Sequence, residues 1–242
     1  MTRAALLFLI CAALTAPGLA SAKSARPVAA RAPVVVELFT AQGCSSCGKA
    51  NTFDGALVER PGVIALTWPV DYWDYLGWKD TFAQPEFTDR QRAYDHHFGL
   101  RDVYTPQVVV DGTAQASGAK SEDVEALIKA ARRAPARPLQ VRLLRGGKVA
   151  IGSGRLPPGG GEVWLIRYDP REQDVEVKDG DNRGHTVPHR NVVRQLVRLG
   201  AWRGHTTQFK LPAASDEGLE TLVLVQGVKG GRILGVLKAP KG

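Results

Sequence analysis

Residues 34–47 read VVVELFTAQGCSSC, and this stretch decides the fold. Residues 34–39 form a largely apolar run of strand length, which is typical of a strand buried on both faces of a parallel sheet. The turn predicted at 40–43 leads into a helix predicted from 47 to 60, where Pro61 ends it. The sequence therefore predicts that a buried strand, a tight turn and a helix start meet at two cysteines.

The elements that follow predict a mixed α/β domain over residues 34–133. Residues 63–66 form a second buried strand, and a strand, a helix and a strand in this order make a right-handed parallel unit. Helical patterns continue at 86–98 and 121–133. Between them, residues 108–110 predict a further strand that ends in a hairpin turn.

In the second half of the chain, residues 139–242, the apolar residues recur with a different spacing. A proline-bearing linker is expected at 134–138, and beyond it apolar and polar residues alternate in short runs separated by Gly- and Pro-rich turns. These runs predict an antiparallel, all-β domain that resembles a sandwich. Residues 192–199 fit either a strand or a short helix, and we expect the strand.

The first residues of the chain have the pattern of a secretory signal. A short basic start precedes an apolar run, and small residues suit cleavage after Ala22, so residues 1–22 are the predicted signal peptide and 23–33 a flexible lead-in. The apolar run is short for a membrane span. A lipoprotein modified at Cys11 is the alternative. We expect an exported protein, periplasmic or extracellular, with no transmembrane segment after cleavage.

Composition and charge exclude several classes of protein. The chain of 242 residues is 44% hydrophobic and carries a net charge of +8, which is typical of a folded globular protein and not of a disordered or collagen-like one. The excess positive charge lies in residues 138–242, where Lys and Arg are scattered singly, as on the solvent face of strands. We therefore expect no nucleic-acid partner. An anionic envelope surface is the alternative, as a weak partner.

The chemistry is expected at Cys44 and Cys47, the two cysteines that remain after signal cleavage. A CxxC pair at the start of a helix suits thiol–disulfide exchange, because unpaired amides and the helix dipole favour a thiolate there. Cys44 is expected to be the accessible nucleophile, with a lowered pKa. Cys47 is expected to be the buried thiol that resolves the mixed disulfide. Protein thiols or disulfides are the expected partners.

Two other uses of the cysteine pair are alternatives to redox chemistry. A structural disulfide that closes so small a loop adds little restriction to the unfolded chain. A zinc site needs about four ligands, and the sequence holds no second CxxC, although two thiolates can bind Cu(I). We favour redox chemistry and expect no metal and no cofactor.

Thr105 and Pro106 are candidate substrate-binding residues. They precede the strand predicted at 108–110, where thioredoxin-like folds place a cis proline beside the two cysteines. The backbone next to such a proline can pair with an extended substrate segment. An ordinary trans proline that opens an edge strand is the alternative.

The aromatic segment, residues 70–80, supplies further candidates. It follows the second buried strand, and open α/β sheets place their sites at the carboxyl ends of such strands. Tyr72, Trp73 and Trp78 are candidate substrate-binding residues, and covering the sheet edge is their alternative role. Asp71 is a candidate acceptor for the proton of the resolving thiol, although a lone Asp is more often a turn residue.

Long motifs link the chain to a known family. They are VELFTAQGCSSC at 36–47, VDYWDYLGWKD at 70–80, FTDRQRAY at 87–94 and VYTPQVVVDG at 103–112. These motifs resemble those of the secreted thioredoxin-like proteins grouped as domain-of-unknown-function family 1223. The resemblance implies a thioredoxin fold, an attached β-rich domain and an export signal, and it implies no settled activity.

The chain departs from the family pattern directly after the second cysteine. The family usually has two prolines there, and this chain has Gly48 and Lys49. Proline pre-organises the first turn of a helix and glycine loosens it, so the thiolate is expected to be held less firmly.

Two functional hypotheses follow from these residues. The first is an exported thiol–disulfide oxidoreductase. The second is a non-enzymatic envelope binding module, or a Cu(I)-binding protein, on the same scaffold.

Overall fold

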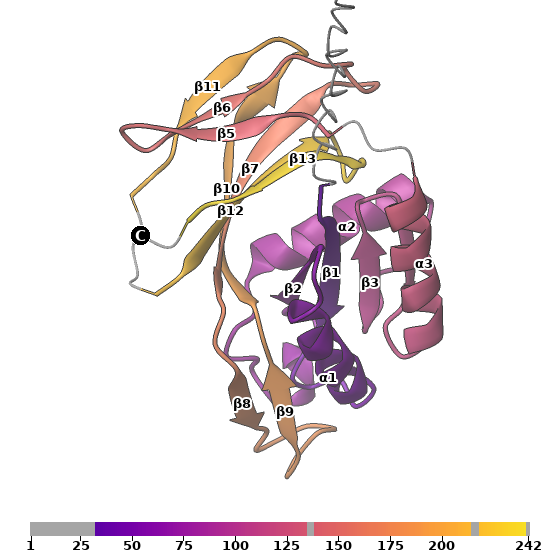
Figure 1. The fold of residues 1–242 in the computed structure, drawn as a ribbon. Coiled ribbons are helices and arrows are strands. Elements are labelled where there is room, and N and C mark those ends of the chain that lie inside the picture. Colours follow the sequence, from indigo (N-terminus) through magenta and orange to yellow (C-terminus); the bar gives the residue numbers. More distant parts are fainter. Residues whose placement is uncertain (1–31, 135–137, 214–217, 241–242) are drawn as a thin grey trace, which may run out of the picture. The chain divides into compact units, whose positions relative to one another are not determined.

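The structure is a computed structural model that describes residues 32–134, 138–213 and 218–240 (Figure 1). The predicted signal peptide, with Cys11, and nearly all of the predicted lead-in lie outside these residues. In the described part of the chain, no helix is both long enough and apolar enough to cross a membrane. The architecture is a mixed α/β fold built on one large sheet.

The large sheet has eight strands in the order β13-β12-β7-β10-β2-β1-β3-β4. Strand β1 (Val34–Thr40) pairs in parallel with β2 (Val63–Pro69) and antiparallel with β3 (Gln107–Val110). The short β4 (Ala114–Ser117) forms the edge beside β3. Every residue of β1 is buried, as expected for a strand with helices on both faces. The predicted parallel strand–helix–strand unit is confirmed.

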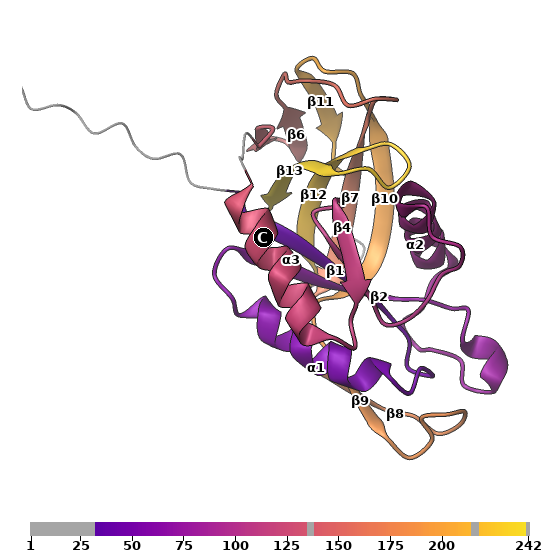
Figure 2. The same ribbon diagram turned by 90° about the vertical axis from the view of Figure 1, so that its right-hand side faces the viewer.

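Three helices cover the two faces of this part of the sheet (Figure 2). Helices α1 (Cys47–Val58) and α3 (Ser121–Arg133) pack on one face, and α2 (Pro85–Phe98) packs on the other. Side chains of a strand alternate between the two faces, so β1 contributes to both apolar clusters. A single 3-10 turn, η1 (Asp74–Leu76), lies in the aromatic segment.

Four strands of the second half extend this same sheet. They are β7 (Gly161–Asp169), β10 (Val192–Trp202), β12 (Glu220–Gly227) and β13 (Ile233–Lys238). The strand expected at 192–199 is confirmed as part of β10. The second half is expected to be an antiparallel, all-β domain, and its strands β7, β10, β12 and β13 share a sheet with the first half, because β10 lies directly beside β2.

Asn191 provides the physical reason for this junction. Its carbonyl accepts from the N–H of Thr67 at 3.1 Å, and its Nδ2 donates to the carbonyl of Ala65 at 2.8 Å. It adopts a φ of 49°, a left-handed conformation that asparagine tolerates. The N–H of Thr67 and the carbonyl of Ala65, two backbone groups on the edge of β2, are thereby satisfied, as buried backbone groups require.

A second layer of strands packs against the extended part of the sheet. This layer is the three-stranded sheet β11-β6-β5, and an apolar cluster around Trp202 fills the space between the two layers. Its strands are β5 (Val141–Leu144), β6 (Lys148–Ile151) and β11 (Thr207–Lys210). The second half therefore does have sandwich-like packing, with one of its layers shared with the first half.

Candidate functional site

Cys44 and Cys47 form a disulfide at the junction of β1 and α1. The S–S distance is 2.08 Å and the Cα atoms lie 5.4 Å apart. Cys47 is the first residue of α1, with Ser46 as its N-cap, and Cys44 lies in the preceding turn. The N–H of Cys47 donates to the carbonyl of Cys44 at 3.0 Å. The predicted position of the pair at a helix start is confirmed.

Both cysteines are buried in this oxidised state. Cys44 is 1% exposed and Cys47 0%, whereas Ser45 and Ser46 between them are exposed. The expectation that Cys44 is accessible is therefore wrong for the disulfide form. Cys44 packs in the apolar cluster that includes Phe39 and Trp68, and a segment from the second half of the chain is bonded to the backbone of the cysteine turn.

We call residues 173–189 the cover hairpin. It consists of β8 (Gln173–Glu176), β9 (Thr186–His189) and the loop between them, and it lies beside α1 (Figure 1). Its buried Asn182 donates from Nδ2 to the carbonyl of Gln42 at 2.7 Å and to that of Cys44 at 2.9 Å. One side chain therefore holds the cover hairpin on the backbone of the cysteine turn.

The cover hairpin also contacts α1 and the aromatic segment. Asn51 of α1 donates from Nδ2 to the carbonyl of Pro188 at 2.9 Å, while its Oδ1 accepts from the Thr40 hydroxyl at 2.7 Å. A Cβ placed on Gly180 would lie 3.3 Å from the carbonyl oxygen of Leu76. The base of the cover hairpin is thus fixed to α1, and its loop lies against the aromatic segment.

Trp73 joins the cysteine turn to the Thr105–Pro106 segment, whose peptide bond is cis as predicted. The indole Nε1 of Trp73 donates to the Thr105 hydroxyl at 2.8 Å. A Cβ placed on Gly43 would lie 3.7 Å from the Cβ of Trp73. The structure therefore brings these two predicted substrate-binding segments together beside the cysteines.

The other aromatic candidates have different surroundings. Burial raises the pKa of Tyr72 to about 12, so its buried hydroxyl is protonated at neutral pH. Trp78 donates from Nε1 to Oε1 of Gln42 at 2.9 Å, and Asp80 accepts from the N–H of Gln42 at 2.7 Å. Burial raises the pKa of Asp80 to about 6. Trp78 and Asp80 thus position the turn two residues before Cys44.

Asp71, the predicted proton acceptor, is bonded to α2. Its carboxylate accepts from the Thr88 hydroxyl at 2.5 Å, and its N–H donates to the same hydroxyl oxygen at 3.2 Å. No contact between Asp71 and the cysteines is found among the described residues, and its role in proton transfer stays a prediction.

A buried carboxyl on α1 was not among the predicted site residues. Asp54 is 2% exposed, and its Oδ1 has no hydrogen-bond partner among the described residues. Burial raises the pKa of Asp54 to about 7, and a hydrogen bond with Thr67 acts in the opposite direction. The spacing of Cys47, Asn51 and Asp54 places all three on one helix face and could have revealed it.

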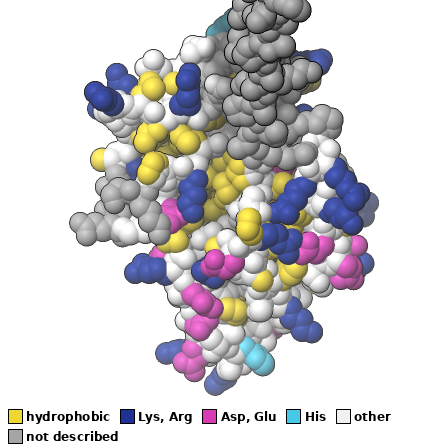
Figure 3. All heavy atoms as spheres, in the orientation of Figure 1, with side chains coloured by type: hydrophobic (Ala, Val, Ile, Leu, Met, Phe, Trp, Pro, Cys, Tyr) yellow, Lys and Arg dark blue, Asp and Glu magenta, His cyan; other side chains and the backbone are white. Residues whose placement is uncertain are grey.

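Charged side chains do not form a single-sign patch on the face drawn in Figure 3. Lys and Arg side chains are interspersed there with Asp, Glu and hydrophobic ones. Within the described ranges, no three His, Cys, Asp or Glu side chains are grouped as a metal site requires.

These features define a mixed α/β protein with a CxxC disulfide where a buried strand meets a helix. Residues 35–226 match the family described as "Protein of unknown function (DUF1223)", and the chain belongs to that family. A comparison with the curated proteins finds no match.

Two solved structures are similar to the chain. A structural-genomics crystal structure of a protein from Agrobacterium tumefaciens is 30% identical, with a TM-score of 0.70, and the match covers 88% of this chain and 96% of that one. HBP35 of Porphyromonas gingivalis is 13% identical, with a TM-score of 0.56, and the match covers 86% of this chain and 75% of that one. The second likeness concerns the fold alone.

Proposed function

We propose that the protein is an exported thiol–disulfide oxidoreductase of thioredoxin-like fold that acts on protein thiols or disulfides. The observation that carries the proposal is the Cys44–Cys47 disulfide at the start of α1, with Trp73 joining the cysteine turn to Thr105. The element order β1-α1-β2-α2-β3-β4-α3 supports the fold, and the apolar first residues of the sequence support export.

The exchange proceeds in two steps when the protein oxidises a dithiol. A substrate thiolate attacks the Cys44 sulfur, the Cys44–Cys47 bond breaks, and Cys47 leaves as a thiolate. A second substrate thiolate then attacks the substrate sulfur of the mixed disulfide and releases Cys44. The substrate loses two electrons and two protons, and the two cysteines gain them. Reduction of a substrate disulfide is the reverse sequence.

The position of each cysteine supports these roles. Cys47 is the first residue of α1, where unpaired amides and the helix dipole stabilise a leaving thiolate. The Oγ of Ser46 lies 3.5 Å from the Sγ of Cys44, within reach to donate to a thiolate there.

Exchange requires that the buried Cys44 becomes exposed, and we propose that movement of the cover hairpin exposes it. Asn182 holds the hairpin on the cysteine turn through two hydrogen bonds. A typical bond of this kind contributes about 1 kcal/mol net. Opening of the loop alone, with the base of the hairpin still on α1, breaks these two bonds and leaves a minor population that can react, so we expect the cover hairpin to slow exchange without preventing it.

The burial of both cysteines favours a second candidate function. In this alternative the protein is a non-enzymatic envelope binding module, and the disulfide is retained for the fold. Tyr75 of the aromatic segment, which is 82% exposed, would then contact the partner.

Reduction of insulin by dithiothreitol, measured with the mature chain as catalyst, separates the two candidates. The exchange proposal predicts catalysis by the wild type, none by Cys44→Ala, and a several-fold faster rate for Asn182→Ala. The exposed neighbour variant Asp181→Ala is the matched control and should leave the rate unchanged. If neither the wild type nor Asn182→Ala catalyses the reaction, the binding module is the better account.

A further inference from the structure

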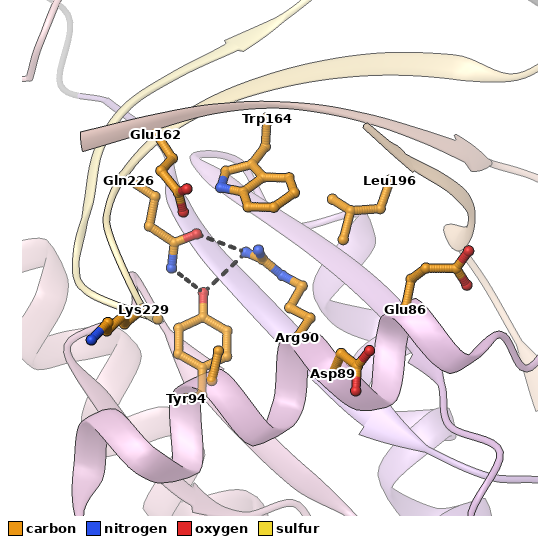
Figure 4. A pocket seen from close by; sticks show the side chains of 11 residues that line it. Glu86, Asp89, Arg90, Tyr94, Glu162, Trp164, Leu196, Gln226 and Lys229 are labelled. Atoms are coloured by element: carbon orange, nitrogen blue, oxygen red, sulfur yellow. Dashed lines mark hydrogen bonds between the residues drawn. The ribbon is translucent and has the colours of Figure 1, made fainter. Parts of the chain in front are cut away.

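A second candidate site lies between α2 and the strands of the second half, away from the cysteines. It is a pocket of about 280 Å³ (Figure 4). Side chains from α2, β7, β10 and β12 line it, together with the turn between β12 and β13. The volume lies just below the range of about 300–1,000 Å³ that drug-sized ligands occupy, so its occupant is smaller.

The floor of the pocket holds a buried cation with an unused donor. The Arg90 side chain is 6% exposed and pairs with Glu37, which accepts from Nε at 2.7 Å and from Nη2 at 3.1 Å. Nη2 also donates to the hydroxyl of Tyr94 at 3.1 Å and to Oε1 of Gln226 at 3.2 Å. None of these bonds uses Nη1. Nη1 is therefore available to donate to a hydrogen-bond acceptor of a ligand that reaches the floor.

The walls of the pocket are mainly apolar. Trp164 and Leu196 face Arg90 across the pocket in Figure 4, and Ala93 adds to the α2 side. An aliphatic or aromatic group of the ligand would be removed from water there, at about 25 cal/mol per Å² of apolar surface. The occupant therefore combines an apolar body with an acceptor.

The rim offers charges of both signs. Two of its carboxylates are already paired, Asp89 with Arg92 and Glu162 with Arg198. Glu86 and Lys229 have no ion-pair partner among the described residues. Figure 4 shows Lys229 at one end of the pocket and Glu86 at the other, with Arg90 between them. The Lys229 ammonium and the Glu86 carboxylate point away from Arg90 in Figure 4, so both exposed side chains must turn inward to contact a ligand that carries one charge of each sign.

The end of the pocket near Lys229 is preformed. Gly230 has a φ of +72°, and a Cβ there would come within 2.6 Å of the carbonyl oxygen of Ala93. The β12–β13 turn therefore approaches α2 as closely as the backbones allow.

We propose that this pocket binds a free amino acid with an apolar side chain. Its carboxylate would be held by Arg90 and Lys229, its ammonium group by Glu86, and its side chain by Trp164 and Leu196. This site is independent of the cysteine chemistry, so it stands or falls separately from the proposed exchange activity.

Calorimetric titration of the mature chain tests the proposal, with L-phenylalanine as the probe. N-acetyl-L-phenylalanine lacks the positive charge, and L-phenylalanine amide lacks the negative one. We expect one molecule of L-phenylalanine bound per chain and at least tenfold weaker binding of each derivative.

Surface variants assign each charge to its partner. Lys229→Ala should weaken binding of L-phenylalanine at least fivefold and leave binding of the amide unchanged. Glu86→Gln should weaken binding of L-phenylalanine by the same factor and leave binding of the N-acetyl derivative unchanged. Lys148→Ala and Glu172→Gln, at exposed positions outside the pocket, are matched controls that should bind as the wild type does.

Two outcomes would overturn the proposal. One is no heat of binding from L-phenylalanine up to its solubility limit in wild type that unfolds cooperatively. The other is binding that Lys229→Ala and Glu86→Gln leave unchanged. Trp164→Ala should abolish binding, and its thermal unfolding shows whether that loss reflects the pocket or the fold.

Discussion

Two buried carboxylates on opposite faces of the large sheet are held in different ways. Glu37, on the α2 side, has both oxygens bonded to Arg90 and also accepts from the hydroxyl of Tyr94. Asp54, on the α1 side, has one oxygen 3.4 Å from the Thr67 hydroxyl and one without a partner among the described residues. The α2 side therefore holds an ion pair, whereas the α1 side, where the cover hairpin lies, holds a carboxyl that keeps its proton up to about neutral pH.

The largest expected effect comes from breaking the ion pair. Arg90→Leu leaves the Glu37 carboxylate buried without its cation, and loss of one partner of a buried pair costs about 3–5 kcal/mol. Urea unfolding at neutral pH measures this change. Arg92→Leu, which breaks an exposed pair on the same helix, is the control and should cost less than about 1 kcal/mol. Equal losses of unfolding free energy in Arg90→Leu and Arg92→Leu would contradict the contrast between the buried and the exposed ion pair.

Removing the unpaired carboxyl should change the pH dependence of stability. The folded-state pKa of Asp54, about 7, lies above its ordinary value of 3.8, so the folded chain binds more protons between these values. The stability that this group contributes is complete below about pH 4 and is lost as the pH rises to about 7. The difference is on the order of 4 kcal/mol. Asp54→Asn should abolish this decline.

The contribution of Asp54 is measured as the difference in unfolding free energy between Asp54→Asn and the wild type at each pH. Burial lowers the pKa of His189 in the cover hairpin to about 4, and that group acts in the opposite direction over part of the same range. Asp89→Asn, at an exposed position, is the control. A wild-type profile that runs parallel to the Asp54→Asn profile from pH 4 to 7 would rule out the buried acid.

A smaller loss is expected from loosening the cover hairpin. Asn182→Ala removes two hydrogen bonds to the carbonyls of the cysteine turn, and we expect it to destabilise the oxidised protein by about 1–2 kcal/mol. Hydrogen exchange should show faster opening of the cover hairpin and of residues 42–47, and no change in α2. Protection that stays at the wild-type level in the cover hairpin would show that Asn182 does not hold it closed.

The smallest effect concerns the glycine that follows the cysteine pair. Gly48 lies in the first turn of α1, and a Cβ there would meet nothing within 4 Å. Gly48→Ala should therefore stabilise the protein by about 0.5–1 kcal/mol. Gly118→Ala is the contrasting variant and should destabilise it, because its Cβ would lie 3.0 Å from that of Pro106. Thermal unfolding of the two variants checks both signs.

Features that depend on neighbouring residues could be predicted from the sequence. The cysteine turn lies within residues 34–47, so the continuous apolar run of a buried strand and the spacing of a helix were sufficient to place it. The helix predicted at 121–133 has those bounds. The cis peptide before Pro106 was expected from its place relative to the CxxC pair.

Features that depend on distant contacts could not be predicted in this way. Asn182 lies 138 positions from Cys44, and nothing in the local pattern of an asparagine in a Gly-rich loop indicates what it covers. The place of β10 beside β2 likewise depends on Asn191, whose side chain bonds to Ala65 126 positions away. Asp54 is different, because its spacing from Cys47 was visible in the sequence.

The central claim is that Cys44 is the reacting cysteine and that the cover hairpin moves to expose it. Trapping of the mixed disulfide tests this claim most directly. Oxidised glutathione is added to the reduced Cys47→Ala and Cys44→Ala variants, and intact-mass spectrometry follows the adduct over time. We predict that Cys47→Ala forms the adduct at Cys44 and that a further Asn182→Ala substitution speeds its formation several-fold. An adduct that forms only in Cys44→Ala, or in neither variant, would contradict the account.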